Sequence, residues 1–456
     1  MTNSASPPGG RLAVRNDAST KPFGTVVAEA AHDQRLIVQP RMGMADPVEM
    51  RAGLLAVKAA KATTVGTITL DSYTRCNDDE SVRRALAGDA RLNGYPIVVH
   101  NSSTTAAMVE SVRGDGPFGI QVRHGSAAPQ RIFQAIAAAG LDATEGGPLS
   151  YCLPYSRVPV AESVLNWVTC CETLLQIRDS AREPHLETFG GCMLGQLCPP
   201  SMLVAISILE ALFFRQHGLR SVSLSYAQQT NAEQDREAIA ALRRIAGELL
   251  HDVEWHVVLY AYMGVYPGTV SGAMRLLDDA ARLAVRVGAA RLIVKTAVEA
   301  YRIPTIAENV AALERAAQTA ERERRAGGRK PPPDTGLLAE ARTLIDTVLE
   351  LAPDIGRALV IAVERGLLDI PFCLHPDNRG RTRACLDGDG RICWSDIGLL
   401  PLSPEVAVSG ADRLGSADLQ RALGFVARKY DSAPPLNGRP RPSAAHIAVP
   451  HSWQEE

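Results

Sequence analysis

The chain has 456 residues, of which 46% are hydrophobic and 21% charged, and its formal net charge is −2. This near-neutral balance gives no basis for a nucleic-acid partner or for binding to an anionic membrane surface. No stretch reaches the roughly 18 consecutive apolar residues that indicate a membrane span, and residues 1–20 lack the apolar core of a secretory signal. The nine cysteines form no CxxC pair, which indicates a reducing cytoplasm rather than a disulfide framework.

Short β-branched runs alternate with longer amphipathic segments from about residue 35 to residue 305. This alternation predicts a parallel sheet covered by helices, and the length fits the roughly 250 residues of a (β/α)8 TIM barrel. A doubly wound open sheet is the alternative, but the first predicted strand is followed by RMGMADP rather than by a glycine-rich phosphate turn. Nine segments qualify as strands for the eight places in a barrel, so one must lie outside it; they are residues 36–40, 64–70, 96–100, 119–124, 142–147, 185–191, 221–226, 255–263 and 291–296.

The chain is expected to divide into a catalytic barrel and a smaller appendage. Residues 1–22 are rich in Ser, Pro and Gly and predict a mobile N-terminal tail, and residues 23–310 form the TIM-barrel domain. Helical patterns interrupted by GGRKPPPD predict a mostly helical C-terminal extension or cap at residues 311–429. Residues 430–456 are Pro-rich and are expected to be a second tail.

Charged residues follow several predicted strands, where barrels carry their active face. Arg41, Arg75 and Arg123 end or follow three different strands, and Glu145 follows a fourth. Each arginine taken alone is more often a structural ion-pair partner. Together, however, strand-end arginines repel one another unless an anion lies between them, and arginine forks bind carboxylates bidentately. With Glu145 suited to an ammonium group, the pattern predicts a dicarboxylic amino acid as the ligand.

Other polar residues near the expected mouth have two interpretations each. Tyr151 and Tyr155 lie close to Glu145 in the stretch ATEGGPLSYCLPY and either line the pocket or simply pack. His124 is equally compatible with a buried core histidine and with a ligand contact. Lys295 and Glu299 are four residues apart, either as an ordinary helix pair or as contacts to a ligand or cofactor.

Several common catalytic motifs are absent from the sequence. There is no GxSxG nucleophile elbow, no HExxH, and no Cys/His cluster at zinc spacing, so no metal ligands are predicted. Cys76 and Cys152 each lie next to a predicted pocket residue, and alternation along an extended chain predicts that both thiols turn away from the pocket. Acid–base catalysis by Glu145, with one of the tyrosines or Lys295, remains open.

A family resemblance is carried by motifs in a fixed order across residues 24–405. These are VQPRMG, DSYTR, LNGYP, VRHG, EGGPLSYCLPY, CPPSM, VKTAVE and LLDIPF. In this order and spacing they resemble the large (epsilon) subunit of glutamate mutase, also called methylaspartate mutase. The resemblance implies a TIM barrel and an adenosylcobalamin-dependent radical isomerase that interconverts L-glutamate and (2S,3S)-3-methylaspartate.

The resemblance also implies the roles of individual residues. The substrate contacts fall on Arg41, Arg75, Arg123, His124, Glu145, Tyr151 and Tyr155, with Arg75 and Glu145 also expected in catalysis. The cofactor contacts fall on Gly43, Asn93, Pro154, Tyr266, Lys295, Glu299 and Ile303. Tyr266 stands where the family is expected to have phenylalanine, and VKTAVE replaces a more polar segment.

The cobalamin-binding subunit of this family carries a DxHxxG motif, which this sequence lacks. The resemblance therefore implies a separate small B12-binding subunit that shares the cofactor, in a cytoplasmic heterotetramer of two large and two small subunits. Two other hypotheses stay open: a barrel lyase or aldolase with Lys295 or Glu145 as base, and a non-catalytic binder of a dicarboxylic amino acid.

Overall fold

The computed structural model describes residues 21–88, 92–114, 116–180, 182–193, 197–327, 331–408 and 416–432. Most of the two expected tails, residues 1–20 and 433–456, lies outside the described residues. The boundaries drawn at residues 310 and 429 stay predictions.

Eight parallel strands form one sheet, in the order β1-β8-β7-β6-β5-β4-β3-β2. Their bounds are β1 Ile37–Gln39, β2 Gly66–Thr69, β3 Ile120–Arg123, β4 Ala143–Glu145, β5 His185–Glu187, β6 Ser221–Ala227, β7 Glu254–Tyr260 and β8 Arg291–Ile293. The two edges of the sheet approach each other where Val38 pairs with Thr64, and the Val38 N–H donates to Thr63 O at 2.9 Å. The sheet is therefore nearly closed into a barrel, which confirms the predicted (β/α)8 architecture.

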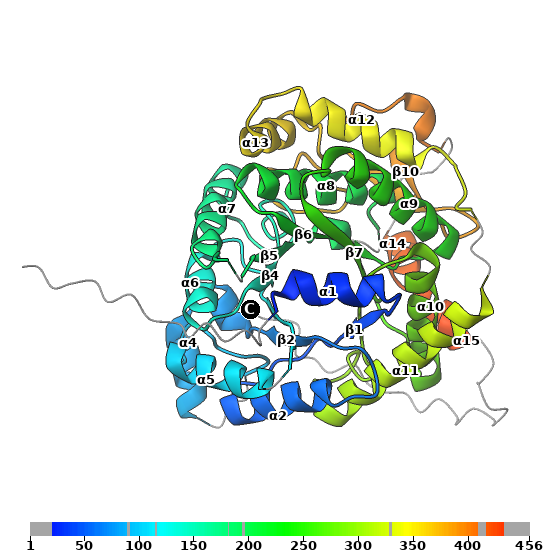
Figure 1. Ribbon diagram of the computed structural model, residues 1–456. Coiled ribbons are helices and arrows are strands. Elements are labelled where there is room, and N and C mark those ends of the chain that lie inside the picture. The colour runs from blue at the N-terminus through cyan, green and yellow to red at the C-terminus, as the bar shows by residue number, and fades with distance from the viewer. Residues whose placement is uncertain are drawn as a thin grey trace, which may run out of the picture.

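Helices form a ring around the strands (Figure 1). They are α2 Pro47–Lys58, α5 Ser102–Arg113, α6 Gln130–Ala138, α7 Val160–Leu175, α8 Pro200–Gln216, α9 Ala232–Leu249, α10 Val270–Val287 and α11 Ile306–Ala326. α8 starts at the pair Pro199-Pro200 and ends just before Gly218, whose φ of +90° suits glycine. α10 is capped by Thr269 at its start and by Gly288 in the left-handed conformation at its end.

Of the nine predicted strands, residues 96–100 are the segment that lies outside the barrel. It forms a turn in which Ile97 N donates to Tyr95 O and Val99 N donates to Pro96 O. Tyr95, just before this segment, makes a single β-bridge with Leu70. Pro96 has no N–H to donate to a strand ladder, and Asn101 caps α5 directly afterwards, so no room for a strand remains.

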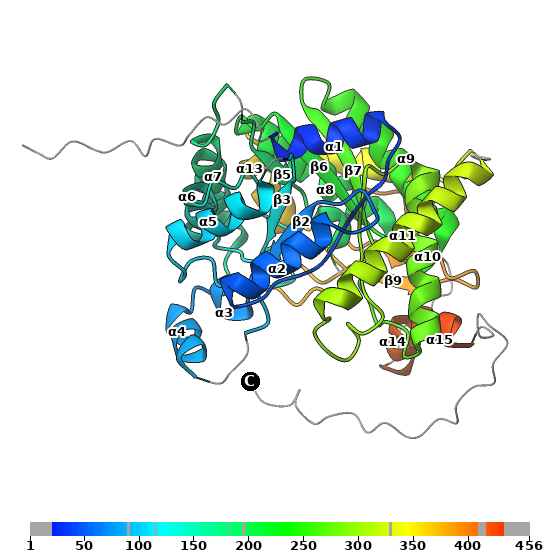
Figure 2. The same ribbon diagram turned by 60° about the horizontal axis from the view of Figure 1, so that its bottom comes forward.

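The two ends of the barrel are covered differently, as Figure 2 shows. Helix α1, Phe23–His32, lies across the amino-terminal end, where Phe23 and Val27 pack with Ile37 and Val65. Short helices lie at the other end: α3 Ser72–Arg75, α4 Asp79–Ala87, α14 Ser416–Leu423 and α15 Phe425–Ser432. The carboxyl ends of the strands thus remain as the end at which a site can be built.

The region between α11 and α14 packs on the outside of the ring. It contains α12 Leu337–Leu349, α13 Ile355–Arg365, the hairpin of β9 Arg383–Leu386 with β10 Ile392–Asp396, and the short 3-10 helix η2 Pro404–Val406. α12 contacts α8 and α9, and α13 contacts α7 and α8. Within the described ranges, no helix combines the length and apolar character needed to cross a membrane.

Candidate active site

A buried ion pair between neighbouring strands forms the centre of the candidate site. Arg123 ends β3 and Glu145 ends β4, and Arg123 Nε donates to Glu145 Oε2 at 2.7 Å. Tyr151, in the loop after β4, donates its hydroxyl to Glu145 Oε1 at 2.5 Å. Since all three residues are at most 5% exposed, their charges act in a poorly solvated environment.

Arg75 and Arg41 lie near this pair. Arg75, at the end of α3, donates through Nε and Nη2 to Leu70 O at 3.1 and 2.7 Å, which holds its guanidinium on the barrel rim. Burial lowers the pKa of Arg75, and the nearby charges of Arg123 and Arg41 lower it further, while Tyr151 and Glu145 raise it. The structure therefore brings the three predicted arginines to one end of the barrel. Arg123 is already paired with Glu145 there.

His124 is buried against aromatic rings beside the ion pair. Its ring lies 5.0 Å from that of Tyr151 and stacks on Trp167 at 6.1 Å. Burial, together with the charge of Arg75, lowers the pKa of His124 to about 3, so the ring is neutral. Because Nδ1 accepts the Ser126 N–H at 3.1 Å, the proton of the neutral ring is on Nε2. Within the described residues Nε2 makes no hydrogen bond of full geometry, but a nearby backbone group of Glu145 favours the protonated ring, so this buried donor is only weakly satisfied.

The loop after β4 places its remaining predicted residues at the rim. Tyr155 is 53% exposed, and its ring lies 5.9 Å from that of Tyr151. Pro154 is half-buried in the same loop. The thiol of Cys152 donates to Val158 O at 3.1 Å and lies 3.6 Å from His375 Nε2, so it turns away from the ion pair as predicted. Cys76 is exposed at the end of α3.

A second group of predicted residues lies at the ends of β8 and β7. Lys295 Nζ lies 4.4 Å from the ring centroid of Tyr266, and burial, followed by the charge of Arg41, lowers the pKa of Lys295 to about 8. Glu299 connects this group to the arginines, because its Oε2 lies 3.4 Å from Arg41 Nη1. Ile303, a few residues further along, is exposed.

Gly43 and Asn93 form a third group, next to the end of β2. A Cβ on Gly43 would lie 2.1 Å from Thr69 O and 3.1 Å from the Cα of Gly94, so only glycine allows the two loops to approach this closely. Asn93 is exposed, and its Oδ1 accepts the Ser72 N–H at 3.1 Å at the start of α3. These contacts bring the first and second loops of the mouth together.

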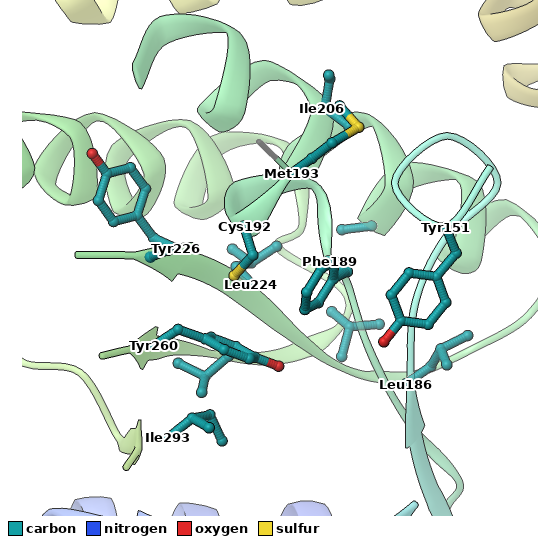
Figure 3. Close-up of a cluster of buried hydrophobic side chains, with 14 of the residues drawn as sticks. Tyr151, Leu186, Phe189, Cys192, Met193, Ile206, Leu224, Tyr226, Tyr260 and Ile293 are labelled. Atoms are coloured by element: carbon teal, nitrogen blue, oxygen red, sulfur yellow. The ribbon is translucent and has the colours of Figure 1, made fainter. Parts of the chain in front are cut away.

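The sequence interpretation missed a polar network beneath the ion pair. The Tyr260 hydroxyl, at the end of β7, donates to Glu145 Oε2 at 2.7 Å and also contacts Glu187 of β5. Glu187 pairs with Arg291 of β8, and both side chains are fully buried in the barrel. In Figure 3 the hydroxyls of Tyr151 and Tyr260 approach the same region from opposite sides. The sequence did contain a signal for this network, because Glu187 and Arg291 are opposite charges inside two segments predicted to be buried strands.

Glu210 was also missed, because it lies in the middle of α8 far from any strand end. Its carboxylate accepts the N–H groups of Leu149 and Ser150 at 3.2 and 2.8 Å, and that of Gly190 at 3.0 Å. Ser150 Oγ donates to it as well, at 3.0 Å. This one buried side chain therefore fixes the loop that carries Tyr151 and the loop that follows β5.

Several buried polar atoms without partners lie at the same end of the barrel. Within the described part of the chain they include Thr69 Oγ1, His124 Nε2, Tyr266 OH and Thr296 Oγ1. Each comes from the end of a different strand or the loop after it. Leaving such atoms unpaired costs about 1–3 kcal/mol each, so the mouth suits a polar ligand that would satisfy them. No group of three or more His, Cys, Asp or Glu side chains within the described ranges is placed to hold a metal ion.

Fold and site together define a (β/α)8-barrel protein with a buried ion pair at the carboxyl ends of its strands, the position at which barrel enzymes carry their active sites. The chain belongs to the methylaspartate mutase E chain family, whose model matches residues 18–421. The resemblance inferred from the sequence motifs is thus confirmed.

Three relatives illustrate this membership. The glutamate mutase epsilon subunit of Yersinia enterocolitica is 31% identical over 406 residues, covering 85% of this chain and 82% of that protein. The epsilon subunit of Escherichia coli O157:H7 is 29% identical over 405 residues, with the same coverage of 85% and 82%. That of Haloarcula marismortui is 29% identical over 410 residues, covering 87% and 82%.

Proposed function

We propose that this chain is the catalytic subunit of an adenosylcobalamin-dependent mutase that interconverts L-glutamate and (2S,3S)-3-methylaspartate. The observation that carries the proposal is the convergence of three arginines and Glu145 at the mouth of a barrel of this family. Glutamate has two carboxylates and one ammonium group, which suits a site with several guanidiniums and one carboxylate.

Each charged group would have a distinct part in holding the substrate. Arg75 donates through Nε and Nη2 to Leu70 O, which fixes the plane of its guanidinium. The N–H groups that Leu70 O does not accept would bind a substrate carboxylate. Arg41 would hold the other carboxylate and Glu145 the ammonium group. Arg123 orients Glu145 through their ion pair and supports the carboxylate binding. Tyr151 and Tyr155 would line the substrate side, with His124 donating from Nε2.

The residues at the ends of β7 and β8 fit the adenosyl end of the cofactor. Tyr266 is 7% exposed, and its hydroxyl has no hydrogen-bond partner among the described residues. A bound ligand would supply the hydrogen bond that this buried hydroxyl lacks. Lys295 and Glu299 supply an amine and a carboxylate that can bind ribose hydroxyls. Gly43, Asn93, Pro154 and Ile303 complete the proposed contacts. When bound, adenosylcobalamin would supply homolysis of its Co–C bond and hence abstraction of hydrogen from the substrate.

A separate cobalamin-binding subunit would close the mouth of the barrel. The rim there exposes apolar side chains, each in a loop or short helix after the carboxyl end of a strand. They are Tyr73 (42% exposed), Tyr155 (53%), Val265 (47%), Tyr301 (61%) and Ile303 (59%). An apolar rim around buried polar side chains suits a protein partner, and its docking would exclude water from radical chemistry. The partner expected from the sequence is a small protein with a DxHxxG motif.

The test is reconstitution of the complex. The chain is mixed in the dark with such a partner, adenosylcobalamin and L-glutamate, and methylaspartate is measured by chromatography. Product is expected only when both proteins and the cofactor are present. Absence of methylaspartate, with the partner shown to bind cobalamin, would overturn the proposal; release of ammonia or a cleavage product would favour a lyase instead.

A further inference from the structure

Tyr260 joins two buried carboxylates with a single hydroxyl group. Its oxygen lies 2.7 Å from Glu145 Oε2 and also within hydrogen-bond distance of Glu187 Oε1. The tyrosine is 1% exposed, and neither carboxylate is more than 2% exposed. Since a phenol carries one proton, it can donate fully to only one of these two oxygens at a time.

The surrounding cations balance the two carboxylates. Arg123 donates to Glu145, and its guanidinium also lies 4.9 Å from the ring centroid of Tyr260. Arg291 pairs with Glu187 on the other side. Two carboxylates this close would repel each other in a dry interior if the shared phenolic proton were missing.

Glu187 is held rigidly from below. Its Oε2 accepts from Ser223 Oγ at 3.0 Å and from Gln121 Nε2 at 3.2 Å, in addition to Arg291. Arg291 is fully buried and is fixed in turn by Gln39 Oε1 at 2.6 Å and His256 Nε2 at 3.0 Å. The interior of the barrel thus supplies a fixed anchor directly under the candidate site.

We infer that Tyr260 is a positioning residue that shares its proton between Glu145 and Glu187, and that this sharing sets the orientation and charge of Glu145 for binding the substrate ammonium group. The inference rests on the proposed role of Glu145. Tyr260 does not need to touch the substrate itself, because it acts through the carboxylate on which the ammonium group would bind.

Other titratable groups also face this network and must be considered in any pH measurement. They are Arg123 from β3, Tyr151 and Tyr155 from the loop after β4, His185 from β5, Cys192 from the 3-10 helix η1 (Gly190–Cys192), Arg75 from α3, and Arg291 and His256 from β8 and β7. None of these groups is a hydrogen-bond donor shared by the two carboxylates. Comparing single variants of the same complex therefore isolates the effect of the Tyr260 hydroxyl.

The test compares Tyr260→Phe with a matched control, Tyr226→Phe. Tyr226 is also a fully buried tyrosine, on the neighbouring strand β6, and its hydroxyl donates to the buried carboxylate of Asp235 at 3.0 Å. In Figure 3 the Tyr226 hydroxyl points away from those of Tyr260 and Tyr151. Both variants lose a buried phenol–carboxylate bond, but only Tyr260→Phe loses the one to Glu145.

L-Glutamate binding is measured by calorimetry between about pH 5 and 9. The protein is the full chain with its partner subunit loaded with hydroxocobalamin, which cannot start turnover. Tyr260→Phe is expected to raise Kd about tenfold or more, and to move the loss of binding on acidification to higher pH, because an unshielded carboxylate pair takes up a proton more easily. Tyr226→Phe is expected to lower Tm without either effect. The acid limb of kcat/KM with adenosylcobalamin should move in the same way.

Glu187→Gln supplies the opposite change. Without the second negative charge, the acid limb should move to lower pH, a reversal that loss of packing alone does not produce. If this variant does not fold, because it leaves Arg291 without its counterion, the comparison of the two tyrosine variants decides alone.

Three results would overturn the inference: an unchanged Kd and acid limb in Tyr260→Phe, equal shifts in Tyr226→Phe, or an upward shift in Glu187→Gln. A wild-type complex that does not bind L-glutamate at all would overturn the proposed function, and this inference with it. Wild-type binding with no difference between the tyrosine variants would overturn only the inference.

Discussion

The carboxylate of Glu210 occupies the space that a side chain on Gly147 would need. A Cβ on Gly147 would lie 2.1 Å from Oε1 and 2.4 Å from Oε2 of Glu210. The same carboxylate accepts the N–H groups of Leu149 and Ser150, so the absence of a side chain lets α8 hold the loop that leads to Tyr151. The geometry of the candidate site therefore depends on a helix that contributes no residue to it.

Gly147→Ala should displace Glu210 and loosen this loop. Overpacking of this kind costs about 1–3 kcal/mol, so we expect a Tm lower by several degrees and weaker binding of L-glutamate. Gly247→Ala is the control, because nothing lies within 4 Å of a Cβ at that position of α9, and helix propensity favours alanine there. A Gly147→Ala variant with an unchanged Tm would contradict the assigned contact.

The pH dependence of stability should contain a contribution from Glu210. Burial raises the pKa of Glu210 from 4.5 to about 7, although hydrogen bonds from Ser150, Leu149 and Phe189 oppose this. The folded state therefore binds more protons than the unfolded chain between these values, and the free energy of unfolding falls as pH rises through about 7. The change corresponds to at most about 3 kcal/mol.

Urea unfolding at several pH values between about 5 and 8 measures this slope. Glu210→Gln should flatten it. Part of the slope should remain, because burial also raises the pKa of Asp235 to about 7. Equal slopes for the wild-type protein and Glu210→Gln would show that this carboxyl group does not titrate in that range.

Arg75→Lys should weaken substrate binding strongly, although it keeps the positive charge at this position. The arginine uses two nitrogens on Leu70 O to fix its plane, and one ammonium group cannot do this and bind a carboxylate in the same geometry. We expect KM for L-glutamate to rise roughly 10- to 100-fold. Arg131→Lys, at the surface pair with Asp79, should leave KM unchanged. Unaltered kinetics in Arg75→Lys would remove Arg75 from the proposed clamp.

Glu145→Gln should affect ligands differently according to whether they carry an ammonium group. We expect the Kd of L-glutamate to rise about tenfold or more, because the charge opposite the ammonium group is lost. The affinity for glutarate, which has both carboxylates but no ammonium group, should stay the same or increase, since Arg123 loses its internal counterion. Calorimetry with both ligands checks this, and an equal loss for both would argue against the ammonium role.

Tyr266→Phe should leave the fold intact. The buried hydroxyl of Tyr266 has no partner in the described residues, so its removal costs no internal hydrogen bond and should hold or raise Tm. If the hydroxyl contacts the cofactor, the apparent Kd for adenosylcobalamin in the complex should rise several-fold. Tyr226→Phe, which does lose a bond to Asp235, should lower Tm. A lower Tm for Tyr266→Phe would reveal a structural partner for this hydroxyl.

Much of the fold and part of the site were accessible from the sequence. Strand–helix alternation predicted the barrel, since the two periodicities of apolar residues follow from local geometry. Eight of nine predicted strands are strands of the barrel, whereas residues 96–100 form a turn that leads directly into α5. The placement of Arg41, Arg123 and Glu145 at strand ends predicted that they would gather at one mouth. Their motifs led to the family, which the comparison confirms.

Only the tertiary structure decided which side chains form hydrogen bonds and ion pairs with one another. Arg123 is paired with Glu145, Tyr260 joins Glu145 to Glu187, and Glu210 reaches the loop from the middle of α8. Periodicity shows which face of an element is buried but not which residue lies opposite it, because partners in a closed barrel come from strands far apart in the chain. The sequence by itself thus determined the architecture and the kinds of side chain at the mouth. Barrel closure decided the pairs that cross the barrel, Tyr260 with Glu145 and Arg291 with Glu187, because it brings side chains of non-neighbouring strands within hydrogen-bond distance.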